Sequence, residues 1–203
     1  MTNQTNGQEQ NHRRMQGLTK AATVFSKLFE VAYWVGAAGF LVGLALFILS
    51  PYVPGDWVFV MTAQEELTVQ GFSLLVTGPD AQLIRPAVVI FLVTGAVVLG
   101  LMAFIFRNVN LILRTTQGLT RFSQGKTPFQ KDNVRMVREM GFAFLAVAAV
   151  QLTASALAFL LLGPEIAEAG VNMSSAVTGV LMLCLSQVFA LGMEMQKDVD
   201  GLV

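Results

Sequence analysis

Residues 86–106 read PAVVIFLVTGAVVLGLMAFIF and contain no charged side chain. A helix rises about 1.5 Å per residue, so roughly 20 apolar residues cross the hydrocarbon core of a membrane, which is about 30 Å thick. Three further stretches are similarly apolar, at about 29–49, 140–162 and 174–193, and their one charged residue is Glu30, at the start of the first. Backbone amides in lipid must pair within their own segment. The sequence therefore predicts an all-α membrane protein with four transmembrane helices in a compact bundle.

The composition agrees with this fold class. Charged residues make up 13% of the 203 residues, against about 25% in a soluble domain. The first apolar stretch is longer than the core of a signal peptide and no A-x-A-like site follows it, which indicates a retained span. Residues 1–17 are rich in Asn, Gln and Gly, and we expect a disordered cytoplasmic leader there. Residues 18–203 then form one four-span membrane domain.

The basic residues predict the orientation of the chain. Lys and Arg favour the cytoplasmic side of a membrane. Twelve of the 13 basic residues lie in the leader, in the segment between spans two and three, and in the tail, whereas Arg85 alone lies in the other two connections. Both termini are therefore expected to be cytoplasmic.

The connection between spans one and two contains β-prone runs. Residues 57–60, 67–69 and 72–76 are apolar or β-branched, and Gln70-Gly71 separates the last two runs. This pattern predicts a small β-hairpin lying on the membrane face. A packed cap is the simpler interpretation of this loop, and a ligand-binding loop is the alternative.

The segment between spans two and three carries regularly spaced arginines. Arg107, Arg114 and Arg121 are seven residues apart, a spacing that keeps them on one face of a helix continuing span two. Gly125-Lys126 is expected to end this helix before a new one starts near Thr127. The segment is interpreted either as a stop sequence touching anionic lipid headgroups or as a docking surface for a protein. The candidate contacts are Arg107, Arg114, Arg121, Lys126, Phe129, Asn133, Arg135 and Arg138.

The same segment and the tail resemble a known family. The runs GKTPF at 125–129, DNVR at 132–135 and REMG at 138–141, with QVF at 187–189 and DGLV at 200–203, resemble conserved motifs of the bacterial DUF2975 membrane proteins. Asp132 stands where that family usually has Glu. The resemblance implies a four-helix protein of the bacterial inner membrane with uncharacterised activity. Some members are encoded beside a small helix-turn-helix regulator, which suggests membrane-linked transcriptional control.

Polar residues are scarce inside the four spans. Gln151 and Gln187 are the deepest strongly polar side chains, Ser155 is close to Gln151 in sequence, and Glu194 lies near a cytoplasmic end. Hydrogen bonds between helices explain such residues first, because each is worth roughly 0.6 to 2 kcal/mol. A substrate site is the alternative.

Small residues recur at helical spacing in two spans. Gly39 and Gly43 form a G-x-x-x-G pair with Gly36 one turn earlier, and Ser175 and Gly179 repeat the spacing in span four. Such pairs allow two helices to approach closely. A compact bundle explains the pattern, and so does a homo-oligomer. Cys184 is expected to be a small core residue.

No set of residues for catalysis is evident in the sequence. One Cys and one His argue against a disulfide framework, a zinc site or a haem site, and no cofactor is expected. The formal net charge is zero, which disfavours direct nucleic-acid binding. An enzyme using Asp132, Glu139 and Glu194 at the membrane surface would lack a nucleophile or metal set.

Two functions remain from these observations. The first is a non-enzymatic protein of the lipid bilayer that binds or scaffolds a cytosolic or membrane partner through the basic segment 107–139. The second is a small transporter or channel component that works as an oligomer, with a polar lining from Gln151, Ser155 and Gln187.

Overall fold

The computed structural model describes residues 2–49, 66–78, 83–119, 130–164 and 173–200, and the side chains of all of these except 2–16, 199 and 200. Its elements, in chain order, are α1 (Thr2–Leu49), β1 (Glu66–Val69), β2 (Phe72–Leu75), α3 (Arg85–Thr116), α4 (Lys131–Leu162) and α5 (Ser174–Asp200). The predicted segment at 57–60 lies outside the described residues, as do Arg121, Lys126 and Phe129.

The prediction of four membrane-spanning helices is confirmed. Within the described residues, four helices are long and apolar enough to cross a membrane, at Gly17–Leu49, Arg85–Thr116, Lys131–Leu162 and Ser174–Asp198. At one end of the bundle, the helices end within one residue of the positions that the sequence predicts, at Leu49, Arg85, Leu162 and Ser174. On the other side the helices continue for several residues past the apolar stretches, since a formed helix extends into polar sequence without a new nucleation step.

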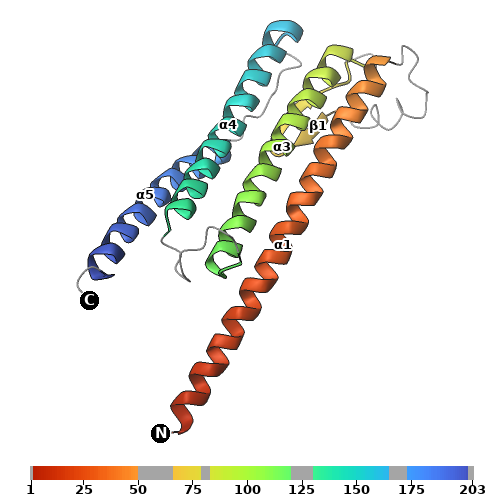
Figure 1. Cartoon of the computed structure of the whole chain (residues 1–203). Coiled ribbons are helices and arrows are strands. Elements are labelled where there is room, and N and C mark those ends of the chain that lie inside the picture. Colours follow the sequence, from red (N-terminus) through yellow and green to blue (C-terminus); the bar gives the residue numbers. More distant parts are fainter. Residues whose placement is uncertain (1, 50–65, 79–82, 120–129, 165–172, 201–203) are drawn as a thin grey trace.

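The helices form a bundle in which each packs on the next in chain order. α1 packs on α3, α3 on α4, and α4 on α5, so the helices lie side by side with both chain termini at the same end (Figure 1). We call this the basic end, because Arg107, Arg114, Arg135 and Arg138 lie there, and the opposite end the hairpin end. Large apolar side chains such as Leu49 and Leu160 are more than three-quarters exposed, at 78% and 79%. Such surfaces suit lipid rather than water.

Three local boundaries differ from the sequence predictions. α1 begins at Thr2, so it continues through the leader for which disorder is predicted. α3 ends at Thr116, before the expected break at 125, because Gly118 adopts a φ of +73° and the amide of Leu119 donates to the carbonyl of Arg114. This is the usual left-handed end of a helix. The N-cap of α4 is Gln130 rather than Thr127, which lies outside the described residues.

The predicted hairpin is confirmed, but its place is different. β1 and β2 are antiparallel, with Val69 opposite Phe72. Gln70 and Gly71 between them both have positive φ, +50° and +80°, as a two-residue type I′ turn requires. The hairpin lies beside α3 (Figure 1) rather than on the membrane face. Phe72, Leu74 and Val76 are buried there.

One apolar core joins the hairpin to the helices. The three buried hairpin side chains contact Ala87, Val88 and Phe91 of α3 and small residues of α4, with Phe40 of α1 at the margin. The rings of Phe72 and Phe91 stack with centroids 6.4 Å apart. Lipid tails are as apolar as these side chains, so close van der Waals packing, rather than removal of apolar surface from water, holds this core together. The hairpin is therefore held by the same core that joins α3 to α4.

A second apolar cluster lies nearer the basic end. Ile105 of α3 packs there with Val137, Met140 and Ala143 of α4, and Met182 of α5 lies against them. This cluster joins three helices close to the point where the arginines begin. It holds the basic ends of α3 and α4 at a defined separation.

Candidate functional site

Four arginines are exposed at the basic end. Arg107 and Arg114 lie on α3, and Arg135 and Arg138 lie on α4. Within the described part of the chain the ion pairs are Lys27–Glu30 and Arg135–Glu139, so Arg107, Arg114 and Arg138 have no carboxylate partner there. Asn133, which the sequence groups with these arginines, is fully buried on the core side of α4. The arginines therefore form an exposed cationic surface without Asn133.

Arg135 differs from the other three in having a local partner. Its Nε donates a hydrogen bond to Glu139 Oε1 at 2.7 Å, one helical turn away. The hydrogen bond and the charge of Glu139 raise the pKa of Arg135 above its ordinary value. The guanidinium therefore stays charged at every physiological pH, with donors left for another anion.

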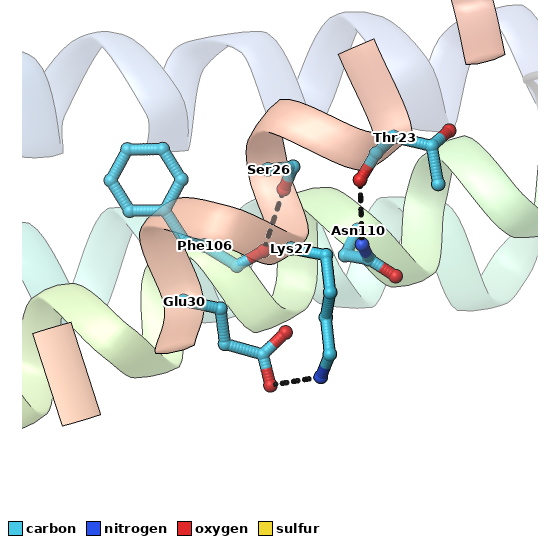
Figure 2. Close-up of polar contacts among 6 residues, drawn as sticks. All are labelled: Thr23, Ser26, Lys27, Glu30, Phe106 and Asn110. Carbon is cyan, nitrogen blue, oxygen red and sulfur yellow. Dashed lines mark hydrogen bonds and ion pairs between the residues drawn. The ribbon is translucent and has the colours of Figure 1, made fainter. Parts of the chain in front are cut away.

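Polar side chains join α1 to α3 toward the basic end of these helices (Figure 2). Ser26 Oγ donates to the carbonyl oxygen of Phe106 at 3.0 Å, and Asn110 Nδ2 donates to the carbonyl oxygen of Thr23 at 3.1 Å. Nearer the end of α3, Gln117 Nε2 donates to Thr23 Oγ1 at 3.0 Å. These contacts hold the helix that carries Arg107 and Arg114 against α1. Their partners include backbone carbonyls, which sequence spacing does not reveal.

The deep polar residues of the spans have separate surroundings. Gln151 is fully buried, and its Nε2 donates to the carbonyl oxygen of Gln70 in the hairpin turn at 3.0 Å. Ser155 Oγ donates to the carbonyl oxygen of Gln151 within α4 at 2.9 Å. Gln187 and Glu194 are instead exposed on α5. The described structure does not gather these residues into one polar path.

The small residues predicted to pack between helices lie at two helix crossings, α1 with α3 and α4 with α5. A Cβ on Gly36 would lie 3.2 Å from Leu99, and one on Gly43 would lie 3.9 Å from Leu92, so both face α3. Gly39 has no neighbour within 4 Å of such a Cβ. Gly39 and Gly43 therefore do not act as a pair at the α1–α3 crossing.

The crossing of α4 and α5 is closer. A Cβ on Gly179 would lie 2.9 Å from the carbonyl oxygen of Gly141, a partner that the sequence pattern does not single out. Ser175, the other predicted member of this pair, is half-buried. Cys184, expected in the core, is exposed on α5 because it lies on a face that α4 does not cover.

An apolar groove of about 430 Å³ lies between α3 and α4. It is lined from Val89 to Val97 on one side and from Ala149 to Leu157 on the other. Its polar lining groups are the hydroxyls of Thr94 and Thr153, and the latter donates to the carbonyl oxygen of Ala149. The groove therefore gathers none of the charged or amide candidates.

No group of three or more potential metal ligands is present among the described residues. Comparison of the whole chain with known protein families, with curated proteins and with solved structures found no match. The function is therefore argued from the geometry of this chain alone.

Proposed function

We propose that this protein is a non-enzymatic component of the bacterial inner membrane that binds a cytosolic partner through the arginines at its basic end. The observation that carries the proposal is the exposed surface formed by Arg107, Arg114, Arg135 and Arg138, of which three lack a carboxylate partner within the described residues. The excess of basic residues at this end supports placing it in the cytoplasm.

The distance of each arginine from the apolar span separates a protein partner from lipid headgroups. Arg107 directly follows the apolar stretch that ends at Phe106, and Arg138 lies two residues before the one that starts near Met140. At about 1.5 Å per residue, Arg114 lies about 12 Å beyond Phe106, and Arg135 lies about 7 Å before Met140. Headgroups extend only about 5–8 Å from the hydrocarbon core. Arg114 is therefore placed for a protein partner.

The resemblance of residues 125–141 to DUF2975 proteins supports a regulatory partner. A small helix-turn-helix protein is the partner that this resemblance suggests, bound through an acidic surface and thereby kept at the membrane. Charged contacts of this kind set the association rate and partner choice.

The test compares two matched double variants after purification in mild detergent. Arg114→Gln with Arg135→Gln is the outer variant and removes the two charges farther from the hydrocarbon core, at about 12 Å and 7 Å. Arg107→Gln with Arg138→Gln is the inner variant and removes the same number within about 3 Å of the core. We expect the outer variant to lose a co-purifying protein that wild type and the inner variant retain, with binding weakened by salt. Retention of every co-purifying protein by the outer variant would refute docking at this surface.

The alternative function, an oligomeric transporter or channel component lined by Gln151, Ser155 and Gln187, receives less support. Gln151 is buried and engaged with the hairpin, whereas Gln187 is exposed on α5. A polar transport path lined by both residues would require helix packing that differs from the described structure.

A further inference from the structure

The hairpin turn lies near the middle of the membrane-spanning region. Gln151, which donates to the carbonyl oxygen of Gln70, is 11 residues before the end of α4 at Leu162. At about 1.5 Å per residue, this places the turn roughly 16 Å inside the span, or about half of a 30 Å hydrocarbon core. On the other side of the turn, Gln70 Nε2 donates to Tyr33 Oη of α1 at 3.0 Å. Tyr33 is 16 residues before the end of α1 at Leu49, or about 24 Å inside by the same measure, so the long Gln70 side chain reaches from the middle of the span toward the basic end.

The two faces of the hairpin differ in polarity. Phe72, Leu74 and Val76 point into the core, as described above. The opposite face carries Glu66, Thr68 and Gln70, all exposed, together with Ser73, whose Oγ lies 3.1 Å from Thr68 Oγ1. The alternation follows from the two-residue period of a strand. The polar face therefore points away from α3 and α4.

Lipid is an unsuitable environment for this face. The sheet consists of β1 and β2, so the outer backbone edge of β1 has no strand beside it among the described residues. Exposed sheet edges do not occur in hydrocarbon, and non-helical backbone at membrane depth is found where protein buries it or where it lines a water-filled cavity. Polar side chains that face hydrocarbon at this depth also raise the free energy of the protein, because they lose their hydrogen bonds with water.

From these observations we infer that the polar face of the hairpin lines a water-filled vestibule that runs from the hairpin end of the bundle to the middle of the membrane. Glu66 lies toward its mouth, and Thr68 and Ser73 line its wall. The contacts of Gln70 with Tyr33 and Gln151 form its floor. The vestibule gives water and small polar solutes access from one side of the membrane only.

A polar atom lies beneath the floor of the vestibule. Gln151 Oε1 is buried and has no hydrogen-bond donor among the described residues. An amide oxygen left in this state costs about 1–3 kcal/mol. Gln151 is fully buried, so the vestibule ends above this atom, at the contact between Gln70 and Gln151.

Cysteine labelling tests the vestibule. In a background with Cys184→Ser, Thr68→Cys places a thiol on the polar face, and Leu152→Cys places one on an exposed apolar position of α4 beside Gln151. A charged, membrane-impermeant methanethiosulfonate is added to right-side-out and to inverted membrane vesicles. The cysteine thiolate attacks the reagent, forms a mixed disulfide and expels methanesulfinate. The fraction of thiolate falls tenfold for each unit by which apolar surroundings raise a thiol pKa.

The vestibule predicts that Thr68→Cys reacts roughly tenfold or more faster than Leu152→Cys, and from one side of the vesicle only. Ser73→Cys, from the other strand, should behave in the same way. Equal protection of Thr68→Cys and Leu152→Cys would refute the vestibule. Oxidative cross-linking of Thr68→Cys into a dimer would refute it too, because a second copy would then cover this face instead of water.

Discussion

The crossing of α4 and α5 depends on two glycines that face each other. A Cβ on Gly179 would lie 2.9 Å from the carbonyl oxygen of Gly141 and 3.0 Å from the amide nitrogen of Leu145. Both atoms belong to the backbone, so neither can rotate away as a side chain can. The two helices can therefore come this close because Gly179 has no Cβ atom.

We predict that Gly179→Ala separates α4 from α5 and lowers the thermal stability of the purified protein. Overpacking of this kind costs about 1–3 kcal/mol. Size-exclusion chromatography in detergent after heating to a series of temperatures measures the change. Gly39→Ala is the matched control, since a Cβ there meets no atom within 4 Å. Equal melting temperatures for the two variants would contradict the described crossing.

At the scale of elements, the hairpin combines a local signal with a non-local position. The Gln70-Gly71 pair between two apolar runs predicts the turn, and both residues adopt the positive φ that this turn requires. The burial of Phe72 and Leu74 and the contact with Gln151 join this element to helices far away in sequence. Its turn and its tertiary contacts can therefore be disturbed separately.

Gly71→Val tests the turn, since a β-branched residue at φ +80° is strained. We expect a cost of about 1–2 kcal/mol and faster amide hydrogen exchange in residues 66–76, with α3 and α4 unchanged. Gln70→Asn is the comparison, because Asn tolerates the left-handed conformation but is too short to keep the contact with Tyr33. Unchanged exchange in Gly71→Val would show that the turn is not under this constraint.

At the scale of the whole molecule, the four described helices that are long and apolar enough to cross a membrane bring the chain back to the end where it began (Figure 1). Apart from Arg85, which lies at the other end, the basic residues that the structure describes gather at that same end. We predict that both termini are cytoplasmic. Green fluorescent protein fused to either terminus should fluoresce, and alkaline phosphatase fused to either terminus should be inactive. Opposite results at the two termini would contradict an even number of crossings.

The sequence alone determined the number, position and helical state of the spans, because lipid requires roughly 20 consecutive apolar residues whose amides pair locally. It also indicated the hairpin through Gln70-Gly71, since turn chemistry depends on neighbouring residues. Only the tertiary structure decided that the hairpin descends beside α3, that Gln151 holds its turn and that Gly141 meets Gly179. Those contacts depend on which helix faces meet, and the periodicity of one segment does not specify the face of another segment that it will contact.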